Sequence, residues 1–128
     1  MHHLVVAIAE DDPDHLDLIR LIVESLAGAC SIIAATTCAE ILTLTAGKKP
    51  NLILLDLRIP GDGFACVQQL KANPATRAIP VIAITAMSLD RDVVIAAGFD
   101  DYIQKPFDVD ALASKVRAYL EPGLSSPG

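Results

Sequence analysis

The side chains that could carry chemistry in this sequence stand at the ends of short apolar segments. Carboxylates follow or end two of these segments, a hydroxyl ends a third, and an ammonium follows a fourth. In chain order the residues are Glu10, Asp11 and Asp12, then Asp56, then Thr85, then Lys105. Carboxylates held about 4 Å apart repel one another by about 4 kcal/mol per pair at an effective dielectric constant of about 20. A cluster of them therefore takes up protons or binds a cation.

A cation site of this composition favours Mg²⁺, and its neighbours favour phosphoryl chemistry. Hard oxygen ligands in a shallow site suit Mg²⁺, which keeps several waters and uses one or two carboxylates together with a phosphoryl group. A carboxylate nucleophile, a hydroxyl and a cation beside that metal are the groups that phosphoryl transfer to an aspartate needs. The sequence contains no Gly-rich phosphate-binding loop, so a nucleotide is not expected as the phosphoryl donor.

Most of these residues also have a simpler interpretation when each is taken alone. The acids at 10–12 could complement the positive end of a helix dipole, and Lys105 could be a solvated lysine. Neither explanation accounts for Asp56, which follows four apolar residues. Pro106, directly after Lys105, allows a cis peptide bond that would fix the backbone at this point.

Short apolar segments alternate with longer amphipathic ones, which predicts strands alternating with helices. The expected strands are 4–9, 31–35, 51–56, 80–85 and 101–104. The expected helices begin at about 13, 38, 64, 90 and 109 and end near 28, 46, 72, 97 and 120. Units of about 20–25 residues with short links demand parallel strands and right-handed crossovers in a doubly wound sheet. Because ligands bind at the carboxyl ends of such strands, the residues above are expected to converge there.

Length, composition and charge limit the class of protein. The chain has 128 residues, a formal net charge of −6 and 52% hydrophobic residues. This composition fits one domain with an aliphatic core and disfavours a nucleic-acid surface, which needs a basic patch. No apolar run reaches the roughly 20 residues of a membrane span and no signal peptide is visible, so we expect a cytoplasmic protein. Three cysteines without a Cys-x-x-Cys motif predict buried thiols.

Four motifs at the ends of the expected strands resemble those of the receiver domain of two-component response regulators. They are Ala-Glu-Asp-Asp-Pro at 9–13, Leu-Leu-Asp-Leu-Arg-Ile-Pro-Gly at 54–61, Pro-Val-Ile-Ala-Ile-Thr-Ala at 80–86 and Gly-Phe-Asp-Asp-Tyr-Ile-Gln-Lys-Pro-Phe at 98–107. The resemblance covers about residues 4–120. It implies an α/β flavodoxin-like fold with strand order 2-1-3-4-5 and five helices. We expect a receiver domain at 1–121 and a flexible tail or the start of a linker at 122–128.

The resemblance implies which residues carry the chemistry. Asp56 would accept a phosphoryl group from a sensor histidine kinase or a histidine phosphotransfer protein. The ligands of Mg²⁺ would be Glu10, Asp11, Asp56 and the backbone carbonyl of Arg58. Asp12 is interpreted as a helix cap rather than a metal ligand.

The same resemblance implies a conformational switch. Thr85 and Lys105 would bind phosphoryl oxygens, and Tyr102 would turn into the space that the threonine leaves. This change would alter the face made by the fourth helix, the fifth strand and the fifth helix, where a downstream protein partner would bind. Arg58 and Met87, each two residues beyond a site residue, would flank the path of attacking water and alter autodephosphorylation.

Two spacings depart from the usual pattern of the family. Pro60 lies three positions before Gly63, one fewer than usual, and Thr85 lies twenty positions before Lys105, about two fewer than usual. The site residues themselves are present, so the departures bear more on switching than on chemistry.

Other classes of function stay open on the sequence alone. The chain could be a phosphorylation-independent scaffold, or a receiver excised from a hybrid kinase or multidomain regulator. An aspartyl phosphatase would need a second acid where Arg58 stands, and a flavin carrier would need more aromatic residues than 4%. We expect a signalling switch rather than an enzyme, with no direct binding to nucleic acid or membrane, as a monomer or weak homodimer.

Overall fold

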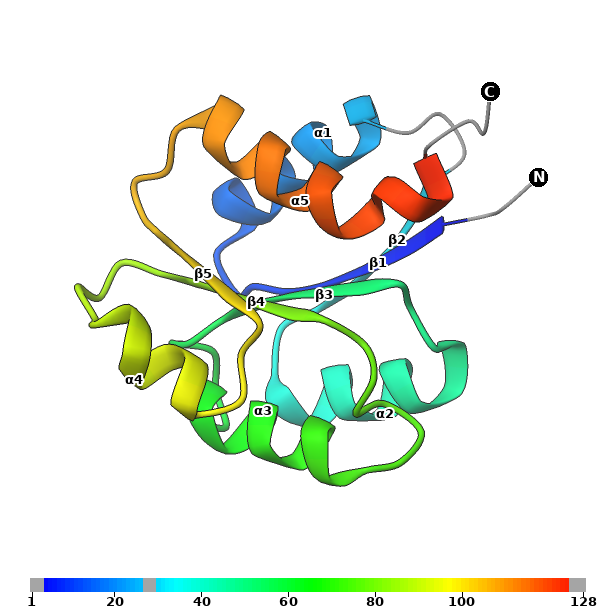
Figure 1. Cartoon of the computed structure of the whole chain (residues 1–128), viewed down its shortest axis with the longest axis vertical. Coiled ribbons are helices and arrows are strands. Elements are labelled where there is room, and N and C mark those ends of the chain that lie inside the picture. Colours follow the sequence, from blue (N-terminus) through cyan, green and yellow to red (C-terminus); the bar gives the residue numbers. More distant parts are fainter. Residues whose placement is uncertain (1–3, 27–29, 125–128) are drawn as a thin grey trace.

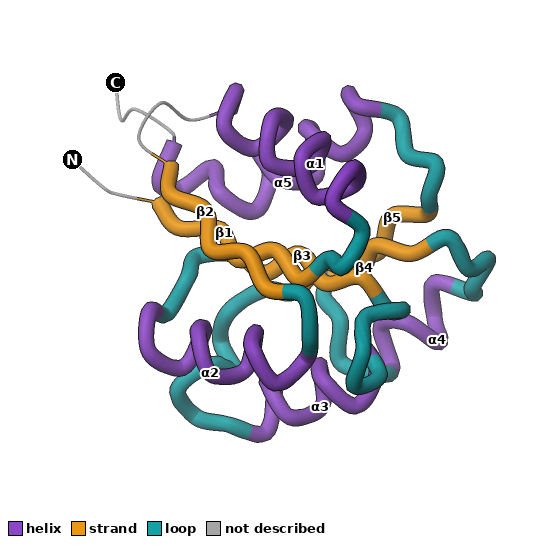
Figure 2. The backbone as a smooth tube through the Cα atoms, turned by 180° about the vertical axis from the view of Figure 1, so that it is seen from behind, coloured by secondary structure: helices purple, strands orange, loops and turns teal. Residues whose placement is uncertain are grey.

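The computed structural model describes residues 4–26 and 30–124, in which five strands alternate with five helices. The strands are β1 (Leu4–Ala9), β2 (Cys30–Ala35), β3 (Leu52–Asp56), β4 (Val81–Thr85) and β5 (Asp101–Gln104). The helices are α1 (Pro13–Leu26), α2 (Cys38–Lys48), α3 (Gly63–Ala72), α4 (Arg91–Ala96) and α5 (Val109–Leu124). Helices α1 and α5 cover one face of the sheet, and α2, α3 and α4 lie on the other (Figures 1 and 2).

The sheet is parallel throughout and its strand order is β2-β1-β3-β4-β5, which confirms the predicted doubly wound, flavodoxin-like class. The chain moves outward in one direction from β1 to β2 and in the other direction from β3 to β5. Ala9 of β1 pairs with Leu55 of β3, so Glu10, directly after β1, and Asp56, the last residue of β3, follow side by side. The ends of β1 and β3 therefore form the point at which such sheets bind ligands.

Both faces of the central strand β3 are buried. Ile53 and Leu55 belong to the apolar cluster under α2 and α3, and Leu52 and Leu54 belong to the cluster under α1 and α5. Because neither face meets solvent, the strand appears in the sequence as an unbroken apolar run rather than an alternating one. The apolar run ends at Asp56, a buried polar residue at the carboxyl end of the strand.

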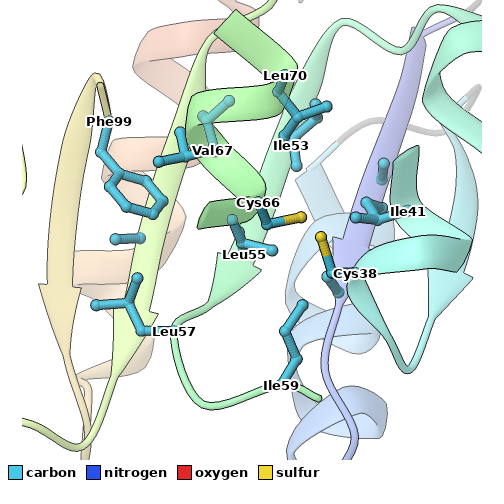
Figure 3. Close-up of a cluster of buried hydrophobic side chains, with 14 of the residues drawn as sticks. Cys38, Ile41, Ile53, Leu55, Leu57, Ile59, Cys66, Val67, Leu70 and Phe99 are labelled. Carbon is cyan, nitrogen blue, oxygen red and sulfur yellow. The ribbon is translucent and has the colours of Figure 1, made fainter. Parts of the chain in front are cut away.

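The cysteines are free thiols, as expected. Cys38 of α2 and Cys66 of α3 are buried, and their sulfur atoms face each other within the apolar cluster (Figure 3). Burial raises the pKa of the Cys66 thiol, with the hydrogen bond to Cys38 acting in the same direction. Cys30 is only half-buried, so the prediction of buried thiols holds in full for two of the three.

Side-chain caps begin α1 and α2 where the sequence predicts them. The Oδ1 atom of Asp12 accepts hydrogen bonds from the backbone N–H groups of Asp14 and His15, at 2.9 and 3.4 Å. Thr37 accepts one from the N–H of Glu40 at 3.2 Å. These contacts satisfy N–H groups that the first helical turn would otherwise leave unpaired.

The element boundaries follow the prediction closely except at the carboxyl end. Most differ by one or two residues, but α5 continues to Leu124, four residues beyond its expected end. Residues 125–128 of the expected tail, and Gly28 at the expected end of α1, lie outside the described residues. Within the described ranges, no helix combines the length and the hydropathy that crossing a membrane requires.

The turn between β3 and α3 is tight where the sequence is one residue shorter than usual. Gly61 adopts a φ of +102°, which favours glycine. A Cβ atom on Gly63 would lie 2.6 Å from the Cα atom of Leu57, so this position has no room for a side chain. The carbonyl of Pro60 accepts a hydrogen bond from the N–H of Cys38 at 3.0 Å, which ties the turn to the start of α2.

Candidate functional site

Three carboxylates meet at the carboxyl ends of β1 and β3. Glu10, Asp11 and Asp56 each offer an oxygen atom, and these oxygen atoms all lie within 4.8 Å of one another. Glu10 is 2% exposed and Asp56 is 6% exposed, whereas Asp11 faces solvent. Two of the three carboxylates are therefore largely shielded from water, and a buried charge needs a cationic partner.

Lys105, directly after β5, supplies that partner. Its Nζ atom donates hydrogen bonds to Glu10 Oε1 at 2.6 Å and to Asp56 Oδ2 at 3.0 Å. The backbone N–H of Lys105 is bonded to the carbonyl of Thr85 at 2.7 Å, and its peptide bond to Pro106 is cis, as the sequence allowed. The lysine thus reaches the carboxylates from a backbone held against β4.

The pKa values of the buried pair reflect this arrangement. Burial raises the pKa of Glu10, and the hydrogen bond from Lys105 offsets only part of that rise. Burial alone would lower the pKa of Lys105, but the hydrogen bonds to Glu10 and Asp56 raise it above its ordinary value. Lys105 is therefore held in its charged form at neutral pH.

The carboxylates border a shallow cleft of about 240 Å³. The lining residues are Glu10, Asp11, Asp12, His15, Asp56, Arg58, Ala86 and Lys105. Two ligands of one Mg²⁺ ion lie at most about 4.2 Å apart, because each Mg–O distance is about 2.1 Å. Oxygen atoms that are already within 4.8 Å of one another need only a small movement to meet this limit, so the donor set fits a small, hard divalent cation.

Arg58 contributes both backbone and side chain to this cleft. Its backbone N–H donates to Asp56 Oδ1 at 2.9 Å, which fixes the orientation of that carboxylate. Its side chain is exposed at the rim of the cleft. The interpretation of its carbonyl as a metal ligand stays a prediction.

Thr85 and Met87 flank Ala86, which lines the cleft, and the hydrogen bonds described for their polar groups go to other partners than the carboxylates. Thr85 is fully buried, and its Oγ1 atom accepts a hydrogen bond from the backbone N–H of Met87 at 3.1 Å. The carbonyl of Met87 accepts a hydrogen bond from the hydroxyl of Tyr102 at 2.8 Å, and that hydroxyl also accepts from the N–H of Leu89 at 3.3 Å. One peptide segment after β4 therefore joins the threonine hydroxyl to the tyrosine hydroxyl.

A second polar cluster joins α4, β5 and α5. Asp101 of β5 accepts hydrogen bonds from Arg91 at 2.7 Å, from Lys115 at 3.1 Å and from the N–H of Tyr102 at 2.8 Å. Burial alone would raise the pKa of Asp101, but these donors, Arg91 first, outweigh it and lower the pKa below its ordinary value. One carboxylate thus joins α4, β5 and α5, the three elements of the face where a downstream partner is expected to bind.

His15 also lines the cleft, although the sequence did not predict a role for it. It lies in the first turn of α1, and its Nδ1 atom is 2.8 Å from Lys105 Nζ. Its spacing offered no clear signal, because Asp11 lies before α1 and the same-face rule for residues four apart applies only within a helix. Asp12, by contrast, acts as the predicted helix cap, and hydrogen bonds to the N–H groups of His15 and Asp14 lower the pKa of its carboxyl group.

Comparison with known proteins gives a consistent family. Residues 6–117 match the response regulator receiver domain. The chain is 36% identical over 118 residues to the DNA-binding dual master transcriptional regulator RpaA of Synechocystis sp., covering 90% of this chain and 48% of that protein. It is 35% identical over 118 residues to the KDP operon transcriptional regulatory protein KdpE of Escherichia coli, covering 90% of this chain and 50% of that protein. The chain therefore spans about half the length of these regulators.

A third relative is closer in length. An uncharacterized 14.6 kDa protein of Leptolyngbya boryana is 32% identical over 117 residues, covering 89% of this chain and 88% of that protein.

Solved structures share the fold. The signal receiver domain of a DNA-binding response regulator from Colwellia psychrerythraea superposes with a TM-score of 0.85 and 29% identity, over 92% of this chain and 98% of that one. The receiver domain of a sensor histidine kinase from Pseudomonas aeruginosa superposes with a TM-score of 0.82 and 24% identity, over 94% of this chain and 99% of that one. The latter crystal structure holds a magnesium ion in its active-site cleft. This chain belongs to the receiver domain family of two-component response regulators.

Proposed function

We propose that this receiver domain accepts a phosphoryl group on Asp56 in a reaction that requires Mg²⁺. The observation that carries the proposal is the position of Lys105, whose ammonium group donates to both Asp56 and Glu10 at the edge of the carboxylate cleft. A cation bonded to the acceptor carboxylate lies where charge develops on a transferred phosphoryl group. The donor would be a phosphohistidine of a sensor histidine kinase or of a histidine phosphotransfer protein.

The transfer is a displacement at phosphorus. One oxygen of the Asp56 carboxylate forms a bond to phosphorus, the bond from phosphorus to the donor imidazole nitrogen breaks, and that nitrogen keeps the electron pair. Glu10, Asp11, Asp56 and the Arg58 carbonyl would hold Mg²⁺, which when bound neutralises charge on the phosphoryl oxygens. The bond from the N–H of Arg58 to Asp56 Oδ1 orients the carboxylate for attack.

The same site supports a switch that passes through Met87. Thr85 would bind a phosphoryl oxygen by donating its hydroxyl proton, and a movement of Thr85 toward that oxygen pulls on the bond that its Oγ1 atom accepts from the Met87 N–H. The Met87 carbonyl and the Leu89 N–H also hold the hydroxyl of Tyr102, so a movement of this segment releases the tyrosine. The phosphoryl group thereby biases two arrangements of the segment after β4.

The surface that responds would be the face made by α4, β5 and α5. Asp101 joins these three elements through Arg91 and Lys115, so a displacement of the segment before α4 is transmitted to β5 and α5. Val93 is 54% exposed and Ile95 is 39% exposed on α4, which offers apolar contact area to a downstream protein partner. The domain would act as a signalling switch that catalyses only its own phosphorylation and dephosphorylation.

Intact-mass measurement after incubation with acetyl phosphate and Mg²⁺ tests the proposal. We expect the mass of the parent to increase by one phosphoryl group, and we expect no gain with a chelator or in Asp56→Asn. Beryllofluoride with Mg²⁺ should shift the resonances of Thr85, Met87 and Tyr102 in the parent alone. Absence of both effects in a folded parent would instead support a phosphorylation-independent scaffold.

A further inference from the structure

The ammonium group of Lys105 has a third partner that the family resemblance did not point to. His15 Nδ1 lies 2.8 Å from Lys105 Nζ, beside the bonds to Glu10 at 2.6 Å and to Asp56 at 3.0 Å. An ammonium group has three N–H donors and no acceptor. All three donors of Lys105 are therefore used, one by each of these side chains.

In the hydrogen bond between His15 and Lys105, the imidazole ring of His15 is the acceptor. Because Lys105 can only donate, His15 Nδ1 must accept, and the proton of the neutral ring lies on Nε2. The carboxylate oxygens nearest to Nδ1 belong to Asp12 at 3.7 Å and Glu10 at 3.9 Å, both beyond hydrogen-bond distance. Among the described residues, Lys105 is thus the hydrogen-bond partner of the His15 ring.

The three acceptors of Lys105 differ in what a metal ion would do to them. Glu10 and Asp56 belong to the carboxylate cluster that fits a divalent cation. A cation bound there competes for their lone pairs and repels the ammonium group. The neutral imidazole of His15 lies outside that cluster and keeps its acceptor free for the lysine.

We propose that His15 is a positioning residue that holds Lys105 in the cleft when a metal ion occupies the carboxylates. Lys105 has a long side chain with several freely rotating bonds, so losing two of three partners would let the ammonium group leave the cleft. With His15 in place, the ammonium group stays where it can meet an oxygen of an incoming phosphoryl group. This inference rests on the proposed phosphorylation of Asp56 for its functional consequence, but the contact itself can be tested separately.

Two substitutions of similar length separate the acceptor from the rest of the side chain. His15→Asn keeps an acceptor oxygen, Oδ1, at the same number of bonds from the backbone as Nδ1. His15→Leu places a methyl group there and keeps the helix, since leucine is a good helix former. Both would be compared with the parent protein at neutral pH and low temperature, where ammonium protons exchange more slowly, in buffer containing Mg²⁺.

Two readouts are required. The first is the ¹⁵N signal of the Lys105 side chain, which is visible only when the ammonium protons exchange slowly with water. The signal is assigned by its absence from the spectrum of Lys105→Met. We expect this signal in the parent and in His15→Asn, and its loss in His15→Leu. The second is a titration with beryllofluoride, a phosphoryl mimic. We expect His15→Leu to weaken its binding by about tenfold, the lower range for a hydrogen bond to a charged group, and His15→Asn to restore it.

The outcomes distinguish this inference from the proposed function. Equal Lys105 signals in the parent and in His15→Leu would overturn the positioning role, whatever the protein does with phosphate. Equal weakening of beryllofluoride binding in both variants would also overturn it, because the acceptor would then be irrelevant. If the parent fails to bind beryllofluoride, the proposed function fails, while the Lys105 signal still decides whether His15 holds the lysine.

Discussion

Neutralising one carboxylate of the cluster should make the folded protein more stable, even though that carboxylate belongs to the site. Asp11 is the suitable position because it is exposed and, within the described residues, its carboxylate has no hydrogen-bond or ion-pair partner. Asp11→Asn keeps the size of the side chain and leaves the contacts of Lys105 with Glu10 and Asp56 intact. The repulsion within the cluster is lost, together with a weaker attraction between Asp11 and the more distant Lys105 ammonium group.

The magnitude follows from the distances. Asp11 has an oxygen atom within 4.8 Å of oxygen atoms of both Glu10 and Asp56. At that separation each pair of charges repels by about 0.9 kcal/mol in water and by about 3.5 kcal/mol at an effective dielectric constant of about 20. Because Asp11 is exposed, the smaller value is the better guide. We expect Asp11→Asn to raise the free energy of unfolding by about 1–2 kcal/mol when divalent cations are removed.

Urea denaturation with a chelator and with Mg²⁺ measures this effect. Mg²⁺ should stabilise the parent, because a ligand that binds the native state raises the free energy of unfolding. It should stabilise Asp11→Asn much less, so the advantage of the variant shrinks or reverses. Asp17→Asn removes the same charge from α1 outside the cluster and should change stability by less than about 0.5 kcal/mol. If Asp11→Asn is no more stable than Asp17→Asn in chelator, the carboxylates do not repel as the distances require.

Three further predictions concern the cluster on β5, the cleft and the β3–α3 turn. The pKa of Asp101 is lowered in the folded state, so its contribution is present above the unfolded pKa of about 3.9 and is lost as pH falls through the folded pKa. Asp101→Asn should therefore lower the free energy of unfolding by about 1–3 kcal/mol at pH 7 and lose this acid dependence, which urea titrations at several pH values would detect. Replacing Arg58 and Met87 together with alanine should shorten the lifetime of phosphorylated protein several-fold by admitting water, and an unchanged lifetime would remove both from that role. Gly63→Ala should cost more than about 2 kcal/mol because its Cβ would meet neighbouring backbone at 2.6 Å, whereas Gly47→Ala, with open space around it, should be neutral or stabilising in thermal denaturation.

The order of elements could be predicted from the sequence because each apolar run is bounded by residues with strong local preferences. The run before Asp56 is buried on both faces, so it is continuous, and it stops at the first polar residue. Asp12 and Thr37 marked helix starts because their side chains cap free N–H groups. The end of α5 could not be predicted, since the helix continues past Pro122, a residue that usually marks a helix end.

The position of the carboxylates could also be predicted from the sequence, but the hydrogen-bond contacts around them could be predicted only in part. Parallel strands must place Glu10 and Asp56 at one edge, and this follows from the alternation of elements alone. The contact between His15 and Lys105 joins residues ninety positions apart and depends on how α1 packs beside the strand ends. Likewise, the bonds that join Thr85 to Tyr102 pass through the backbone of Met87, and side-chain types do not report backbone contacts.

The most direct test of the central claim is to locate the phosphoryl group. After incubation with acetyl phosphate and Mg²⁺, borohydride reduction converts an aspartyl phosphate to homoserine, and peptide mass spectrometry identifies the converted residue. We predict homoserine at position 56 alone, with none when Mg²⁺ is chelated. Conversion at Asp11 or Asp12 in place of Asp56, or an unmodified Asp56 in folded protein, would contradict the proposal that Lys105 and the carboxylate cluster serve phosphorylation of this residue.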